Sequence, residues 1–374
     1  MERLIMSRRR IFVTAASMLV ACHVGAVRAQ EIHRAPKPLG ILLAAGDIAL
    51  CGTEQLHQKH EATAALLARH VREADAQNIP VRVIALGDLA YENGSPNSFE
   101  CFEASWWGAL AKLELVNLKV EDLLLPALGN HDVGSDAGLR YYEFFAKKSN
   151  RWVFQQDPTK KKKLGYYEVG FPDPATGPWR LFGLNSELDG PLMEVQLDWL
   201  SRQLEEKKSP CVLAFWHRPL FSSGWHGHGD CDGVAGLPCK RSNAPLCRPD
   251  ADANYCSSTK IMKQAYRILY DRGGSVVLTG HDHHYEQFKR LDADAKPADK
   301  GIRSFIVGTG GAPLYQIDFE HQWKDEHEFY SHHSFGVLRM DLFADRYRWR
   351  FIPIEGDPVV APATDTDTCN TRPN

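Results

Sequence analysis

The chain has 374 residues and a formal net charge of −3, and 44% of its residues are hydrophobic and 24% are charged. This is an ordinary globular composition with enough apolar material for a large core. The charge balance provides neither a basic field that would recruit nucleic acid nor an acidic tail, so no nucleic-acid partner is expected.

The first 29 residues predict an export signal that is not part of the fold. A basic start at residues 8–10 precedes an apolar stretch, and Val27–Ala29 offers a small-residue cleavage site. Arg9–Val13 resembles a bacterial twin-arginine signal, whereas Leu19–Cys22 resembles a lipoprotein box that ends on the lipidated cysteine. An uncleaved anchor is the remaining alternative, although His23 leaves the apolar run short for a membrane span. We therefore expect an exported protein, periplasmic or secreted, either soluble or lipid-anchored, without a membrane span in its mature chain.

A pattern of apolar run, glycine and aspartate begins at residue 40. The run Gly40–Ala45 is followed by Gly46-Asp47, and residues 55–78 carry apolar side chains at the period of a helix. The leucine-rich and β-branched run Val81–Leu86 predicts a buried strand that ends in Gly87-Asp88. A strand, helix and strand of this length form a βαβ unit whose strands end at one edge. The two aspartates should therefore lie close together, at the edge where α/β sheets bind ligands.

An apolar run that ends in polar side chains recurs further along the chain, twice with a glycine between them and once without. The later copies are Leu123–Leu128 before Gly129-Asn130-His131-Asp132, Cys211–Trp216 before His217, and Ser275–Thr279 before Gly280-His281-Asp282-His283. Residues 218–260, rich in glycine, proline and cysteine, predict a long loop of the kind that is usually functional. The other expected elements are helices over residues 139–145, 193–205 and 261–271, strands over 179–184 and 304–307, and a hairpin of residues 335–342 and 347–353.

Nine cysteines favour an oxidising compartment. Cys51 and Cys101 follow two strand ends that we expect to be neighbours, so a disulfide between them is expected. Cys211 opens an apolar strand and predicts a buried thiol, and Cys369 has no assigned partner. Further disulfides of undetermined pairing are expected in one loop among Cys231, Cys239, Cys247 and Cys256.

Polar donors therefore follow five strands in succession. Any one of them alone would be interpreted as a turn residue or a satisfied polar group. Oxygen and imidazole donors that meet at one sheet edge are the ligands that first-row metal ions need. The donors are Asp47, Asp88 with Tyr91, Asn130 with His131, His217, and His281 with His283.

These motifs resemble those of the calcineurin-like metallophosphoesterases and, more closely, those of their purple acid phosphatase branch. The resemblance covers residues 41–353. Ala49 stands where general members carry a metal-binding histidine, and Tyr91 supplies an oxygen instead, as in purple acid phosphatases. The resemblance implies an α/β fold, an α+β-like four-layer αββα sandwich of two mixed sheets flanked by helices, with a dinuclear metal site at the strand carboxyl ends. The catalytic domain would span residues 40–355, followed by a polar tail, residues 356–374, expected to be loose from Ala361.

The resemblance also implies two metal ions that share one ligand, Asp88. A phenolate beside two carboxylates favours a trivalent ion. The ligands of this Fe(III) ion would be Asp47, Asp88, Tyr91 and His283. The ligands of a divalent Fe, Zn or Mn ion would be Asp88, Asn130, His217 and His281.

The implied activity is hydrolysis of small phosphate monoesters by in-line attack of a metal-bound hydroxide, including in acid. His131 resembles the phosphate-contacting histidine of the family. His226 is the candidate for a second phosphate contact and for the proton donor to the leaving group, with His228 as its competitor. Asp132 and Glu286 are expected to orient the ligands rather than to bind metal.

Two other functions stay open at this point. The same metal core would also serve a phosphodiesterase or nucleotide hydrolase. A protein of a different class would bind metal or phosphate without turnover. The presence of all seven proposed ligands together with His131 favours an enzyme.

Overall fold

The computed structural model describes residues 36–370, apart from residues 53, 117, 149–153, 158–162, 225, 227–252, 317–325 and 359–364. The chain divides into two units, Met1–Lys37 and Pro38–Asn374, and the fold below belongs to the second. The export signal predicted for residues 1–29, His228, and Cys231, Cys239 and Cys247 of the cysteine-rich loop lie outside the described residues, so the disulfides expected in that loop stay a prediction.

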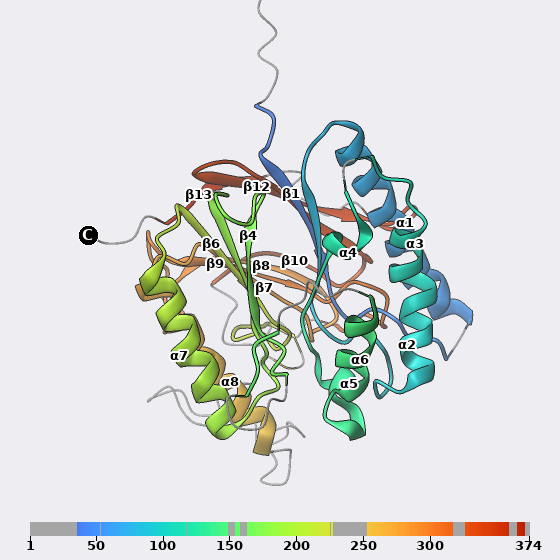
Figure 1. The fold of residues 1–374 in the computed structure, drawn as a ribbon, viewed down its shortest axis with the longest axis horizontal. Coiled ribbons are helices and arrows are strands. Elements are labelled where there is room, and N and C mark those ends of the chain that lie inside the picture. Colours follow the sequence, from blue (N-terminus) through green and yellow to red (C-terminus); the bar gives the residue numbers. More distant parts are fainter. Residues whose placement is uncertain are drawn as a thin grey trace, which may run out of the picture. The chain divides into compact units, whose positions relative to one another are not determined.

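The described strands form two mixed β-sheets (Figure 1). The six-stranded sheet has the order β13-β12-β11-β1-β2-β3, and the seven-stranded sheet has the order β10-β8-β9-β7-β6-β5-β4. The strands of the first sheet are β1 (Gly40–Ala45), β2 (Val81–Ala85), β3 (Leu124–Pro126), β11 (Gly336–Leu342), β12 (Arg346–Pro353) and β13 (Asp365–Thr368). Those of the second are β4 (Tyr167–Phe171), β5 (Trp179–Gly183), β6 (Cys211–Phe215), β7 (Val276–Thr279), β8 (Tyr285–Leu291), β9 (Ile302–Val307) and β10 (His327–Ser331).

Parallel pairing brings several strand ends to one edge of each sheet. β1 runs parallel to β2 with Ile41 opposite Val81, and β2 runs parallel to β3. In the second sheet β5, β6, β7 and β9 run parallel to one another. The predicted βαβ unit is therefore confirmed, with α1 (Glu54–Ala76) as its helix. The strands β1 and β2 are fully buried, as their continuous apolar sequences predict.

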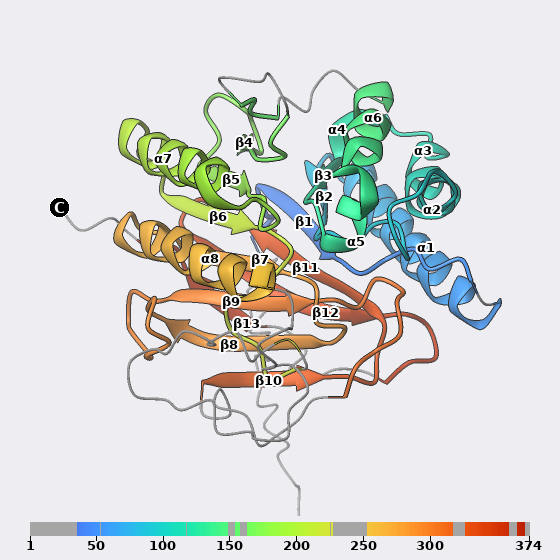
Figure 2. The ribbon, with the colours of Figure 1, turned by 90° about the horizontal axis from the view of Figure 1, so that it is seen from below.

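The two sheets pack face to face, and helices cover their outer faces (Figures 1 and 2). Between the sheets, Phe305 meets Trp349 at a ring-centroid distance of 5.5 Å, and Tyr285 meets Phe351 at 4.6 Å. On the second sheet, α7 (Gly190–Glu206) and α8 (Ala253–Asp271) bury an apolar stripe that includes Leu200. The expected four-layer αββα sandwich is confirmed. None of the described helices is long and apolar enough to cross a membrane.

Shorter helical segments follow β2 and β3 and complete the layer beside α1. They include one π-helical and one 3-10 segment, which carry the labels η1 and η2. They are α2 (Pro96–Phe102), η1 (Glu103–Trp107), α3 (Gly108–Ala111), α4 (Val120–Leu123), α5 (Asn130–Val133), η2 (Gly134–Asp136) and α6 (Leu139–Lys148).

Residues 365–370, the part of the predicted loose tail from Ala361 that the structure describes, are ordered against the fold. β13 pairs antiparallel with β12 along Asp365–Thr368. Asn370 is buried, and its side-chain amide donates to three backbone carbonyl oxygens at 2.6–3.1 Å. The polar sequence misled the prediction because an edge strand is held by backbone hydrogen bonds while its side chains stay largely exposed.

Two disulfides join described segments that lie far apart in the sequence. The predicted disulfide between Cys51 and Cys101 is confirmed, and it ties the segment after β1 to α2. The second joins Cys211, at the start of β6, to Cys369. The expectation that Cys211 is a free buried thiol is therefore wrong. An apolar strand sequence indicates that a cysteine is buried, but it cannot show a partner 158 residues away.

The long loop predicted over residues 218–260 is also shorter than expected, because α8 already begins at Ala253. The first eight residues of α8 lack the apolar period that identifies an amphipathic helix in a sequence. β4, β8 and β10 were not predicted for a related reason. Their sequences are rich in charged or aromatic side chains and lack a clear alternation.

We expect the double substitution of Cys211 and Cys369 by serine to lower the free energy of unfolding by roughly 2–5 kcal/mol. The disulfide closes a separation of 158 residues and therefore restricts the unfolded chain strongly. The midpoint of guanidinium unfolding, measured for the variant and for the parent chain, checks this expectation. Equal midpoints would show that β13 is held by the sheet alone.

Candidate metal centre

The seven proposed ligands meet at the shared carboxyl edge of the strands. Asp47 follows β1, Asp88 follows β2, and Asn130 is the first residue of α5 after β3. His217 follows β6, and the segment between β7 and β8 carries both remaining histidines. Each side chain lies in the segment that follows the end of its strand, as the repeated sequence pattern predicts.

A first group of donor atoms surrounds the Tyr91 hydroxyl. Tyr91 Oη lies 3.0 Å from Asp47 Oδ1, 3.1 Å from Asp88 Oδ2 and 2.9 Å from His283 Nε2. His283 Nε2 is also 3.3 Å from Asp47 Oδ1. All four of these residues are buried, so their polar atoms rely on one another rather than on water for hydrogen bonds.

A second group of donor atoms surrounds His217 Nε2. This nitrogen lies 3.0 Å from Asn130 Oδ1, 3.1 Å from His281 Nδ1 and 3.2 Å from Asp88 Oδ2. Asp88 Oδ2 therefore belongs to both groups. The donor sets are the two that the family resemblance implied.

The spacing of these atoms fits metal coordination. Metal–ligand bonds of about 2.1 Å in octahedral geometry place neighbouring donors about 3 Å apart. The histidines are also oriented as ligands. His217 Nδ1 lies 2.8 Å from Leu86 O and His283 Nδ1 lies 2.7 Å from Pro313 O. A ring nitrogen that donates to a carbonyl leaves the other nitrogen with its lone pair directed at the group.

The electrostatics of the cluster also call for positive charge. Burial lowers the pKa of His217, but the Asp88 carboxylate outweighs it and raises that pKa to about 10. Burial raises the pKa of Asp88, yet His217 holds it below its usual value. The pKa of the Tyr91 phenol is raised well above 10 by burial and by the charges of Asp47 and Asp88. A phenolate at this position therefore needs a cation beside it.

The backbone is shaped to bring the loops this close. Asp47, Asp88 and His281 adopt left-handed conformations with φ of 60°, 48° and 72°. Such conformations are costly for residues with a side chain, and they concentrate at functional sites. Gly129 leaves room for Asp88, because a Cβ at Gly129 would lie 2.1 Å from Asp88 N.

Asp132 ties two of these loops together. Its Oδ1 accepts hydrogen bonds from Leu89 N at 2.8 Å and Ala90 N at 3.1 Å, and its Oδ2 accepts one from Gly129 N at 3.0 Å. Asp132 is fully buried and orients the Asp88 loop against the start of α5. Glu286 does not contact these loops in the same way, and it accepts hydrogen bonds from the backbone N–H and the hydroxyl of Ser223. The contacts of Asp132 agree with the orienting role that the sequence suggested, whereas the orienting role of Glu286 stays a prediction, because its hydrogen bonds reach Ser223 and His284 and none of the proposed ligands.

Two predicted histidines lie at the rim of the cluster. The His131 ring is 4.4 Å from the Tyr91 ring, and its Nε2 is 3.9 Å from Asp88 Oδ2. The His226 ring is 4.0 Å from the His281 ring. The backbone N–H of His226 donates to Asp282 Oδ1 at 3.0 Å, which fixes this part of the loop.

Two further residues at the cluster were not identified from the sequence. The Tyr315 ring stacks on His283 at 4.0 Å and 13°. Arg218 Nη1 lies 3.5 Å from His281 Nε2, and its Nε lies 3.0 Å from both carboxylate oxygens of Glu187. The position of Arg218 directly after His217 could have identified it from the sequence. Tyr315 lacked such a signal, because it lies four residues beyond a glycine-rich strand end. We name His131, His226 and Tyr315 the rim residues.

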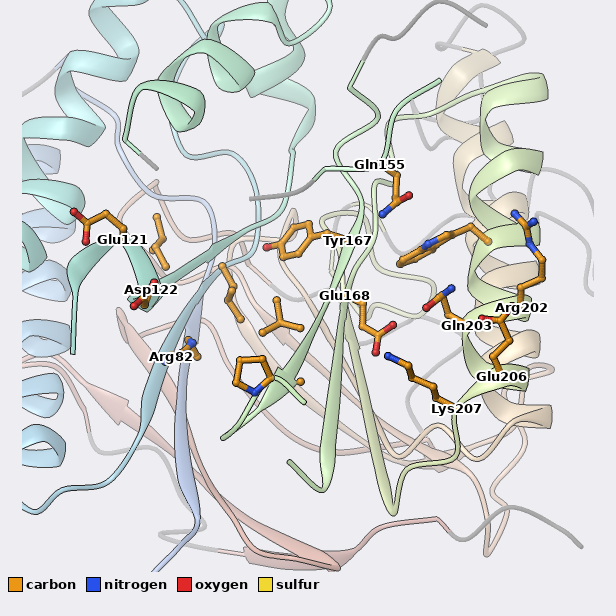
Figure 3. A pocket seen from close by; sticks show the side chains of 16 residues that line it. Arg82, Glu121, Asp122, Gln155, Tyr167, Glu168, Arg202, Gln203, Glu206 and Lys207 are labelled. Carbon is orange, nitrogen blue, oxygen red and sulfur yellow. The ribbon is translucent and has the colours of Figure 1, made fainter. Parts of the chain in front are cut away.

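A cavity of about 660 Å³ lies elsewhere, between β3, β4 and α7 (Figure 3). Figure 3 shows Glu121 and Asp122 on one wall, and Glu168, Gln203 and Lys207 on the other. None of the proposed ligands lines this cavity. We therefore assign the chemistry to the donor cluster rather than to the cavity.

Comparison with known proteins identifies one sequence family. The sequence profile described as calcineurin-like phosphoesterase matches residues 41–285. Purple acid phosphatase 15 of Arabidopsis thaliana is 21% identical over 259 residues, which cover 63% of this chain and 40% of that relative. The chain therefore spans less than half the length of this relative.

Two solved structures share the fold. Purple acid phosphatase PPD1 from seeds of yellow lupin (Lupinus luteus) has a TM-score of 0.59 at 16% identity, over 90% of this chain and 55% of that one. GAP50, the anchor in the inner membrane complex of Plasmodium, has a TM-score of 0.55 at 12% identity, over 89% of each chain.

We expect Gly129→Ala to lower the free energy of unfolding by about 1–3 kcal/mol or more, because the added carbon meets Asp88. The new Cβ would lie 2.1 Å from Asp88 N and 2.2 Å from its Oδ1. Gly52→Ala is the matched control, since a Cβ there meets nothing within 4 Å. Equal thermal unfolding midpoints for the two variants would contradict the close approach of these loops.

Proposed function

Because the chain belongs to the calcineurin-like phosphoesterase family of metal-dependent hydrolases, we propose that it is an exported phosphatase of the purple acid phosphatase type that hydrolyses small phosphate monoesters. The family membership expected from the strand-end motifs is confirmed. The observation that carries the proposal is the pair of donor groups that share Asp88 Oδ2. Two cations held by one bridging carboxylate form the arrangement that serves phosphate-ester hydrolysis.

We assign the two donor groups to different ions. Asp47, Tyr91 and His283 would hold Fe(III) together with Asp88, since a phenolate and two carboxylates offer three hard anionic donors. Asn130, His217 and His281, again with Asp88, would hold a divalent Fe, Zn or Mn ion, because imidazole and amide donors suit such ions. When bound, the cations neutralise charge on the phosphate and lower the pKa of water.

The rim histidines would handle the phosphate and the leaving group. His131 lies beside Tyr91 and reaches toward Asp88, so its ring is placed to contact a phosphate oxygen. His226 is held against His281 by its ring and by Asp282 through its backbone. We assign to His226 a second phosphate contact and the donation of a proton to the leaving-group oxygen. His228 stays the alternative donor.

Export is part of the proposal. Two disulfides within the described residues support an oxidising compartment, because such bonds are rare where thiols are kept reduced. The periplasm or the extracellular space fits this chemistry, with a lipid anchor at Cys22 as the alternative to a soluble form. The domain limits, residues 40–355 for the catalytic part, also stay a prediction.

Two alternatives are separated by experiment. A phosphodiesterase or nucleotide hydrolase would use the same donors. The second alternative is a protein that binds metal or phosphate without turnover. GAP50, which shares the fold, is described as an anchor. The full donor set favours catalysis over this alternative.

We expect the metal-loaded protein to hydrolyse 4-nitrophenyl phosphate faster than bis(4-nitrophenyl) phosphate. The monoester carries more negative charge and less bulk at the rim, and charge is what a dinuclear centre stabilises. Initial rates of nitrophenol release check the expectation. A faster diester reaction would favour the phosphodiesterase, and hydrolysis of neither ester would favour the binding protein.

Two variants serve as matched controls for this assay. Asp88→Ala should lose both metals and all activity, because Asp88 belongs to both donor groups. His226→Ala should keep both metals, measured by elemental analysis, and lose about 10²- to 10⁴-fold in rate if it donates the proton. An undiminished rate in His226→Ala would move this role to His228 or to water.

Tyr91→Phe tests the iron assignment. We expect the metal-loaded protein to absorb visible light through charge transfer from the Tyr91 phenolate to Fe(III). The variant removes only the hydroxyl, so this absorption band should disappear. Tyr315→Phe is the matched control and should keep the band. A colourless parent protein with zinc in both positions would refute the iron assignment.

A further inference from the structure

The glycine-rich segment after β9 brings one more side chain to the rim. Gly310 N donates to Gly46 O at 2.8 Å, and Ala312 N donates to Asp47 O at 2.9 Å. The segment therefore runs along the loop that carries Asp47. Tyr315 N then donates to the carbonyl oxygen of His283 at 2.9 Å. These backbone hydrogen bonds fix Tyr315 relative to two of the proposed ligands.

The glycines make this close approach possible. A Cβ on Gly308 would lie 2.1 Å from Asp282 O, and one on Gly310 would lie 2.5 Å from Gly46 O. Neither contact is tolerable for a real side chain, and both involve backbone atoms that cannot turn aside. The segment is therefore held against the site, and the position of Tyr315 follows from it.

The Tyr315 ring packs against a proposed ligand and lies near a second rim residue. One face of the ring rests on His283 at 4.0 Å and 13°, and the ring centroid is 6.0 Å from that of His226. Tyr315 is half-buried, so part of the ring stays accessible. It carries the largest aromatic ring of the rim residues, whereas the other two are imidazoles suited to contact phosphate oxygens.

We propose that Tyr315 forms a wall of the subsite for the ester group of the substrate and favours phosphate esters with a flat aromatic group over those with a small alkyl group. The proposal rests on the proposed phosphatase function. A phosphate bound beside the rim histidines directs its ester group outward past Tyr315. An aromatic ester group gains contact with the phenol ring there, and a methyl-sized group does not reach it. Tyr315 contacts the substrate and takes no part in proton transfer.

The test measures binding without turnover. The dissociation constants of phenylphosphonate and methylphosphonate are measured by calorimetry for the metal-loaded full chain and for Tyr315→Ala. We expect the variant to bind phenylphosphonate about 2- to 12-fold more weakly, the range of one aromatic pair, and to bind methylphosphonate within about 2-fold of the parent. Tyr315→Phe keeps the ring and should keep the preference for phenylphosphonate. Tyr270→Ala removes a half-buried tyrosine of α8 outside the rim and should change neither constant.

Three results would overturn the inference. Equal weakening of both phosphonates in Tyr315→Ala, together with lost metal by elemental analysis, would mean that Tyr315 only supports His283. A loss of preference in Tyr315→Phe would mean that the hydroxyl, not the ring, makes the contact. An unchanged ratio in Tyr315→Ala would mean that the ring touches no ligand. Failure of the parent protein to bind either phosphonate or to cleave either nitrophenyl ester would contradict the proposed function itself.

Discussion

The structure depends on the burial of the Asp88 carboxylate, which is 1% exposed. A charge removed from water costs several kcal/mol unless partners replace the lost solvation. Asp88 has such partners on every side: Tyr91 Oη and His217 Nε2 approach Oδ2, and His131 N donates to Oδ1 at 2.8 Å. These partners come from three separate segments of the chain. The compensation of this one carboxylate therefore requires that the parallel strands end together, and it explains why the loops around it are built so tightly.

The same contacts hold the two sheets together at this edge. His217 belongs to the second sheet, and its Nδ1 reaches Leu86 O of the first. Asp47 follows a strand of the first sheet and accepts a hydrogen bond from His281 N of the second at 2.8 Å. The polar cluster therefore also joins the two sheets. A change that disturbs the geometry of the site should also lower the stability of the fold. This linkage is the physical reason why left-handed backbone persists at three of the site residues.

Much of the site was predictable because its signal is local in the sequence. Each apolar run that ends in glycine and a donor residue predicts where a strand ends. The βαβ topology then places the ends of parallel strands side by side, as it does for Asp47 and Asp88. What the sequence could not provide is pairing between distant segments without a pattern. The partner of Cys211, the edge strand at Asp365–Thr368 and the stacking of Tyr315 on His283 all depend on such contacts.

The most direct test of the account is anomalous X-ray diffraction from crystals of the metal-loaded protein, with data collected on both sides of the iron absorption edge. The account predicts two peaks about 3.5–4 Å apart with Asp88 between them. The peak beside Tyr91 and His283 should show the iron edge, and the second should lie beside Asn130 and His217. A single peak, or peaks away from Asp88, would contradict the claim that this buried carboxylate exists to bridge two cations.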